Sequence, residues 1–262
     1  MQAASLLYHD VVPDGQPESS GFSGAVANRY KLTIAAFDEH LRAIAARPSL
    51  RCTTAREVLS RDTGQGHQCL FTFDDGGVSA LTEIADRLQT LGWRGHFFIT
   101  TDRIGQPGFL SADQIRELHR RGHVIGSHSR SHPRNIDELD DAALNAEWSE
   151  SSAVLADLLK TPTWCGSVPG GFFSRRVARA AQQAGLKLLF TSEPTCRWSQ
   201  IGELHIAGRL AIVNHTSAEL AAKLASAERL TILRQQLVWT GKKFAKAVAG
   251  GFYRQASEWF FR

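Results

Sequence analysis

Short apolar runs alternate with helical patterns along most of the chain. Six of these runs are rich in leucine, β-branched or aromatic side chains and stop at polar or turn-forming residues, which predicts strands. They lie near residues 6–9, 69–73, 95–100, 123–127, 164–168 and 186–191. Strands that alternate with helices favour a parallel sheet, so the pattern predicts an α/β fold.

Helical periodicity fills the gaps between these runs. Residues 78–91 carry apolar side chains at spacings of three and four, and a glycine follows them. Ser111 and Gln114 form a capping box that begins the next helix. Two further helices are predicted over residues 139–160 and 174–184.

Length and composition favour one folded domain with a short basic tail. The chain has 262 residues, of which 43% are hydrophobic, and this is enough for one sizeable core. Its formal net charge is +4, and residues 240–262 hold five Lys or Arg against one acidic residue. The rest of the chain is therefore formally neutral. We divide the chain into a barrel-like domain over 1–239 and a basic, aromatic-rich helical tail over 240–262.

Two roles for the tail stay open. A basic amphipathic helix with aromatic side chains can bind an anionic membrane surface, or the same helix can cover the bottom of the barrel. No nucleic-acid motif accompanies the charge, so nucleic-acid binding is not expected. No apolar run reaches the ~18 residues of a membrane span, and no signal peptide is visible. We expect a cytoplasmic protein, peripheral to the inner membrane face if the tail binds lipid, with its four cysteines reduced.

Two motifs place polar side chains where predicted strands end. Residues 71–77 read Phe-Thr-Phe-Asp-Asp-Gly-Gly, so an apolar run stops at two carboxylates and two glycines. A second run ends at His128, and His132 follows four residues later. Catalytic groups in α/β barrels sit at strand ends, and two imidazoles with one carboxylate leave coordination positions open on a divalent metal. The sequence therefore predicts a metal site.

These motifs, TFDDG and HSRSH, resemble those of the polysaccharide deacetylases, the NodB-homology group or carbohydrate esterase family 4. The resemblance implies an α/β fold, a distorted (β/α) barrel of about seven parallel strands. It also implies that Asp75, His128 and His132 are the metal ligands and that Asp74 is the catalytic base. Zinc is the metal that the resemblance suggests, although two histidines and an oxygen also suit cobalt, nickel or iron.

A further family motif is found at an unexpected end of the chain. The family's leucine-x-x-His-Asp motif, which supplies the proton donor, normally lies near the C-terminus, but the good match here is Leu6 to Asp10. This implies a circularly permuted barrel of the exopolysaccharide type, in which His9 is the donor, Asp10 orients its ring and Tyr8 contacts substrate. The alternatives are that Tyr8 and His9 are core residues, or that His215 is the donor.

The third and fourth motifs depart from the family pattern. The family's Arg-x-Pro-Tyr-Gly is here Ser-Val-Pro-Gly-Gly over residues 167–171, so the arginine that orients the base is missing. The backbone amide of Gly170 can still meet an oxyanion, and Pro169 and Gly171 are assigned to substrate contact. The aspartate that often pairs with that arginine is also absent. Arg209 is either a replacement for the orienting arginine or a surface residue.

The function that the resemblance implies is metal-dependent hydrolysis of N-acetyl groups on the amino sugars of a poly- or oligosaccharide. Two alternatives stay open. One is a deacylase of a lipid-linked amino sugar at the membrane face, and the other is a catalytically silent glycan-binding module. In each case the partner is an N-acetylated glycan, and nothing in the sequence indicates an oligomeric state.

Overall fold

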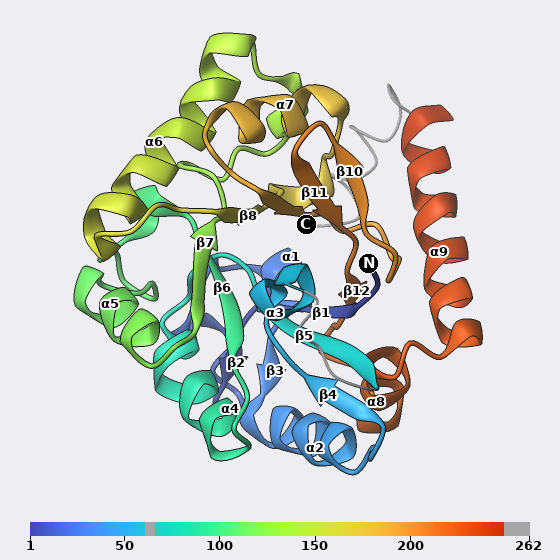
Figure 1. Cartoon of the computed structure of the whole chain (residues 1–262). Helices are drawn as coiled ribbons and strands as arrows, with labels where there is room; N and C mark the ends of the chain where they lie inside the picture. Colours follow the sequence, from blue (N-terminus) through green and yellow to red (C-terminus); the bar gives the residue numbers. More distant parts are fainter. Residues whose placement is uncertain (61–65, 249–262) are drawn as a thin grey trace.

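The computed structural model describes residues 1–60 and 66–248, and the side chains of residues 1–60 and 66–241. A ten-stranded sheet curls into a half-barrel with helices around its outside (Figure 1). The predicted α/β barrel fold is confirmed. The sheet has more strands than the resemblance implied because several short strands extend it at both edges.

The order of strands in the large sheet is β10–β11–β9–β8–β7–β6–β5–β1–β12, and β4 also pairs with β5. Its pairs are parallel except for that between β10 and β11. These strands are β1 (Ala4–Tyr8), β4 (Leu50–Cys52), β5 (His67–Phe73), β6 (Gly95–Ile99), β7 (Val124–Ser127), β8 (Cys165–Ser167), β9 (Leu188–Phe190), β10 (Ser199–Ile201), β11 (Leu204–Ala207) and β12 (Leu210–Ala211). A separate parallel pair is formed by β2 (Val11–Val12) and β3 (Leu32–Thr33).

Helices connect the strands and cover the outer face of the sheet. Ser111 caps the helix that follows it with the predicted capping box. The helix predicted over residues 78–91 has two parts, a π-helical segment and then an α-helix. The helices are α1 (Ala25–Asn28), α2 (Ile34–Ala45), α3 (Ala55–Ser60), η2 (Ala80–Ala85), α4 (Asp86–Thr90), α5 (Ala112–Arg120), α6 (Asp141–Leu159), α7 (Arg175–Gln183), α8 (Ala218–Ala225) and α9 (Arg229–Val248).

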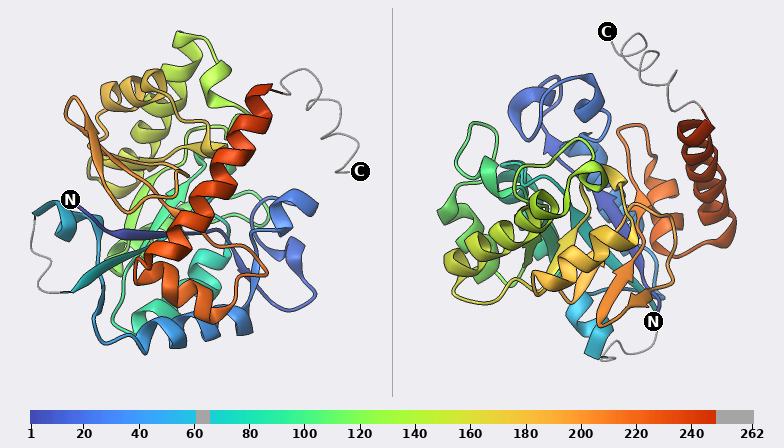
Figure 2. Two further views of the ribbon diagram at one scale, coloured as in Figure 1. Left: turned by 90° about the vertical axis from the view of Figure 1, so that its right-hand side faces the viewer. Right: turned by 90° about the horizontal axis from the view of Figure 1, so that it is seen from above.

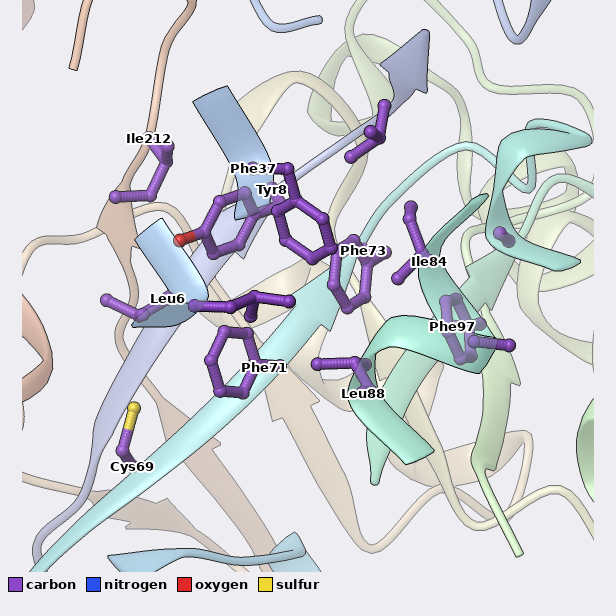
Figure 3. Packing of buried hydrophobic residues seen from close by; sticks show 14 of the residues in the cluster. Leu6, Tyr8, Phe37, Cys69, Phe71, Phe73, Ile84, Leu88, Phe97 and Ile212 are labelled. Carbon is purple, nitrogen blue, oxygen red and sulfur yellow. The ribbon is translucent and has the colours of Figure 1, made fainter. Parts of the chain in front are cut away.

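An aromatic cluster fills the core between β1, β5, β6 and α2 (Figure 3). Tyr8 packs with its ring centroid 5.6 Å from that of Phe37 and 5.5 Å from that of Phe73. Its hydroxyl lies 3.2 Å from His40 Nδ1. Tyr8 is only 1% exposed, and it points into the core rather than to the strand ends. The assignment of Tyr8 to substrate contact is therefore wrong, because the alternation of side chains along β1 sends it to the interior.

The first strand lies where a permuted barrel requires it. β1 pairs in parallel with β5, and Tyr8 is opposite Phe73 in the register. His9 and Asp74, which follow these two residues, therefore leave the sheet at the same edge. All four cysteines are free thiols, as expected.

Helix α9 runs along the outside of the half-barrel next to α8, and Gln235 on it donates a hydrogen bond to the carbonyl of Ala211 in β12 (Figures 1 and 2). It continues without a break across the predicted boundary between residues 239 and 240. The aromatic residues of the tail beyond Val248 lie outside the described residues. In the part of the chain that is described, no helix is both long and apolar enough to cross a membrane.

Candidate active site

Two loops with strained backbones meet at the carboxyl edge of the sheet. Asp75 follows β5 with φ of 75°, and in the loop after β7 Ser129 and His132 have φ of 65° and 58°. Non-glycine residues rarely adopt this left-handed region, and such strain is concentrated at functional sites. Gly77 permits a close approach as well, because a Cβ atom there would lie 2.0 Å from Asp10 Oδ1.

The structure brings together the three residues predicted as metal ligands. Their ligand atoms all lie within 4.8 Å of one another. Asp75 Oδ1 is 3.4 Å from His128 Nε2 and 3.5 Å from His132 Nε2. This buried oxygen has no hydrogen-bond partner among the described residues, which fits an atom that coordinates a cation. The donor set therefore suits a divalent metal such as zinc.

Further hydrogen bonds hold the loop that contains both histidines. His128 Nδ1 donates a hydrogen bond to the carbonyl oxygen of Ser167 at 2.9 Å, and this leaves Nε2 to face Asp75. Between the two histidines, the backbone N–H and the hydroxyl of Ser131 donate to the buried carboxylate of Glu147 at 2.9 and 2.6 Å. Glu147 lies on α6, and no sequence motif includes it. The sequence feature that could have indicated it is an acidic residue on the inward face of a predicted helix.

Asp74 is held by a buried arginine. Arg209 Nη1 and Nη2 donate to its two carboxylate oxygens at 2.7 and 2.8 Å. The same guanidinium donates to Ser167 Oγ at 2.7 Å and to the carbonyl of Thr191 at 3.0 Å. Arg209 is fully buried, which excludes the alternative that it is a surface residue. Ser167 occupies the position of the family's arginine and leaves the space that this guanidinium fills.

Charges around the two aspartates keep them ionised. Burial alone would raise the pKa of Asp74, but Arg209, His128 and His9 together lower it well below its usual value. Burial also opposes ionisation of Asp75, and contacts with His128 and His9 lower its pKa nonetheless. The two carboxylates in turn raise the pKa of His128 against the effect of its burial. The site therefore favours positive charge at the point where the ligands converge.

His9 faces this site, and His215 does not influence it. The charge of His9 contributes to the lowered pKa of both aspartates, whereas His215 is exposed and lies 3.2 Å from the side chain of Asn214. The His9 ring lies 4.7 Å from the ring of Tyr30, between centroids. Its Nδ1 atom is buried without a hydrogen-bond partner in the described part of the chain.

Asp10 does not orient His9, contrary to the expectation. Its Oδ1 accepts hydrogen bonds from Ser20 at 2.6 Å and from Ser79 at 2.7 Å. Burial raises its pKa in spite of these hydrogen bonds. Asp10 therefore ties the loop after β2 to the turn after β5.

The glycine turn after β8 lies beside the site. Pro169 is buried, and it comes two residues after Ser167, which contacts both Asp74 and His128. Gly170 has a left-handed backbone with φ of 61°, and a Cβ atom on Gly171 would lie 3.2 Å from Ser192. The roles assigned to this turn in oxyanion and substrate contact stay predictions.

Comparisons with known proteins agree with this geometry. A family model described as "Polysaccharide deacetylase" matches residues 61–189. The chain is 24% identical over 192 residues to a putative polysaccharide deacetylase, YxkH, of Bacillus subtilis, covering 72% of this chain and 64% of that protein. Across the curated relatives it matches, the chain spans between 27% and 64% of their length.

Solved structures of low sequence identity share the fold. Streptococcus pyogenes deacetylase PplD in complex with acetate has a TM-score of 0.71 at 19% identity, covering 87% of this chain and 99% of that one. IcaB from Ammonifex degensii has a TM-score of 0.70 at 21% identity, covering 86% and 97%. Taken with the motifs, the family match shows that residues 61–189 contain a polysaccharide deacetylase domain, and the solved structures show the same fold.

Proposed function

We propose that this protein hydrolyses N-acetyl groups from the amino sugars of a poly- or oligosaccharide. The observation that carries the proposal is the convergence of Asp75, His128 and His132 beside a second buried carboxylate, Asp74, which Arg209 holds by two hydrogen bonds. These three residues would hold a divalent metal, zinc in the simplest case, which would supply polarisation of a carbonyl oxygen and a more acidic water. Relatives whose names state chitin deacetylase activity support the substrate class.

Asp74 serves as the general base in this proposal. Arg209 fixes the plane of its carboxylate and keeps it ionised, so it can accept the proton of the attacking water. The backbone N–H of Gly170 meets the oxygen that becomes negative as the acetyl carbon turns tetrahedral. His9, as imidazolium, then protonates the leaving amine, which is a poor leaving group without that proton.

The deciding experiment is an acetate-release screen over defined N-acetylated oligosaccharides, with the metal content of the protein measured alongside. Release that depends on the metal and is lost in Asp74→Asn supports the proposal. Glycan binding without release of acetate from any member of the panel would instead identify a silent binding module.

A second candidate is deacylation of a lipid-linked amino sugar at the inner membrane face. A largely apolar cavity of about 650 Å³ lies between α8, α9 and the end of β12, and Arg209 and Ser192 are among the residues that line it. Arg209 also contacts Asp74, so the cavity and the proposed catalytic base share one residue. Faster hydrolysis of a lipid-linked sugar than of the same free sugar would favour this candidate.

Helix α9 supports membrane contact in that second candidate. Four apolar side chains of the helix are exposed, with Leu230 at 68%, Leu233 at 51%, Leu237 at 74% and Val238 at 59%. The sequence from Arg229 to Val248 contains five Lys or Arg and no acidic residue. Exposed apolar side chains on a cationic helix are typical of peripheral attachment to anionic lipid.

A further inference from the structure

The loop between β2 and β3 is fastened over the edge of the sheet next to the site. The backbone N–H of Gly21 donates to the carbonyl of Gly108 at 2.8 Å, and that same carbonyl accepts from Val78 at 2.9 Å. The N–H of Ser79 donates to Ser20 Oγ at 2.9 Å. Three segments that are distant in the sequence are thus held together beside the turn that contains Asp74 and Asp75.

This loop delivers Phe22 to the edge of the proposed metal site. The centroid of its ring is 5.0 Å from that of His132 and 5.1 Å from that of Phe109, which meets it edge-on at 76°. Both phenylalanines are half-buried, so part of their surface stays open. An apolar ring surface next to a catalytic centre suits the C–H face of a sugar ring.

Arg103 adds a positive charge to the two rings. Its guanidinium carbon lies 5.2 Å from the centroid of Phe22 and 5.9 Å from that of Phe109. Its Nη1 donates to Gln106 Oε1 at 2.9 Å, and no carboxylate of the described residues is within ion-pair distance. The rings and Gln106 hold the guanidinium in place, and its other N–H groups are available to donate hydrogen bonds to a ligand.

A second arginine without an acidic partner lies close to His132 in the sequence. Arg134 comes two residues after His132, and it forms no ion pair within the described part of the chain. Arg130 differs, because it pairs with Glu150 at 2.6 Å. Arg103 and Arg134 therefore favour an anionic ligand on these two loops.

We propose that Phe22, Phe109 and Arg103 form a subsite for the sugar unit next to the one that is deacetylated, and that this unit carries an anionic group. The ring of that unit stacks on Phe22, and its carboxylate or phosphate oxygens accept hydrogen bonds from Arg103. This inference rests on the proposed function and specifies its substrate class as acidic N-acetylated glycans.

The test compares three matched N-acetylated oligosaccharides whose neighbouring unit is neutral, a uronic acid or a sugar phosphate. The expected result is a kcat/KM about 10- to 100-fold higher for at least one acidic substrate, mainly through KM, since a hydrogen bond to a charged group has that effect. The better of the two acidic substrates identifies the anion. Arg103→Gln should bring the acidic-to-neutral ratio close to one, and Arg103→Lys should restore part of it.

Two further variants isolate the contributions. Phe22→Leu should raise KM for neutral and acidic substrates alike, because the stacking surface is lost while the charge remains. Arg116→Gln, an exposed arginine on α5 that pairs with Asp113, is the matched control and should leave the ratio unchanged. A wild-type ratio near one, or a preference for acidic substrates that persists in Arg103→Gln, would overturn the subsite.

Binding separates this inference from the proposed reaction. Calorimetry of Asp74→Asn with the three oligosaccharides measures affinity without turnover. Preferential binding of an acidic oligosaccharide that depends on Arg103 supports the subsite even if no acetate is released. Equal affinities would overturn it even in an active enzyme.

Discussion

Asp74 keeps its negative charge although it is fully buried, and Arg209 is the main reason. The guanidinium comes from the segment between β11 and β12, whereas the family's orienting arginine would come from the position of Ser167. An arginine can orient the base from either position, because residue 167 and residue 209 both lie at the same edge of the sheet.

Replacement of Arg209 by Gln should therefore change the pH dependence of the reaction. The lowered pKa of Asp74 keeps the base ionised at acidic pH, and without the guanidinium its burial raises that pKa. The acid limb of the kcat/KM profile should shift to higher pH. Breaking a buried pair costs about 3–5 kcal/mol of stability, so a thermal melt should accompany the kinetics. Arg209→Lys should restore part of the shift, and an unmoved acid limb in a folded variant would contradict the orienting role.

The two adjacent aspartates should respond differently to substitution. Asp74→Asn should retain metal and lose about 10²- to 10⁴-fold in kcat, the usual effect of removing a positioned base. Asp75→Ala, His128→Ala and His132→Ala should each lose the metal, since two ligands do not hold a divalent ion tightly. Elemental analysis of the purified variants distinguishes the two classes. Loss of metal in Asp74→Asn alone would show that the roles are reversed.

The candidate ligands and the candidate base could be recognised in the sequence because they lie in contiguous motifs. Glu147, Phe22 and the pairing of Arg209 with Asp74 depend on contacts between loops that are far apart in the chain. The spacing of residues along the sequence does not reveal such contacts. Tyr8 shows the converse, because it lies within a motif match but its side chain points to the core.

At the scale of elements, the six apolar runs each form a strand, whereas β2, β3, β4, β10 and β11 were not predicted. Those strands have only two to four residues and show no alternation long enough to recognise. Among the strand pairings, the register of β1 against β5 has the largest effect on the site. It sends His9 toward the two aspartates from a position 65 residues earlier in the chain.

His9→Ala and Asp10→Asn test this register. His9→Ala should keep the metal, lose most turnover and abolish the alkaline limb of the pH-rate profile, because the donor must be protonated. Asp10→Asn should keep that limb and nearly full turnover, since its carboxylate binds Ser20 and Ser79 instead of His9. His215→Ala is the control with no expected effect. If the alkaline limb followed His215 instead, the proposed place of His9 in the site would be wrong.

At the scale of the whole molecule, the cavity beneath α9 and the proposed catalytic base share Arg209. Helix α9, which carries the exposed leucines, lies on the outside of the half-barrel (Figure 2). If these leucines inserted into a membrane, the membrane surface would lie next to the cavity beneath α9. The attachment of the protein to lipid and its access to a lipid-linked substrate are therefore linked in the second candidate function.

The double substitution Leu233→Ser with Leu237→Ser should weaken binding to vesicles that contain anionic lipid. Full burial of a leucine contributes about 1.5–3 kcal/mol, so even partial insertion of both predicts a loss of at least ~30-fold in affinity. Cosedimentation with vesicles at several salt concentrations provides the measurement, because the cations of α9 make binding sensitive to salt. Val154→Ser removes an exposed aliphatic side chain from α6 instead, where Val154 is 46% exposed, and should leave binding unchanged. Equal vesicle binding by the double variant and the wild type, with acetate release from a soluble substrate intact in both, would exclude α9 as the membrane contact.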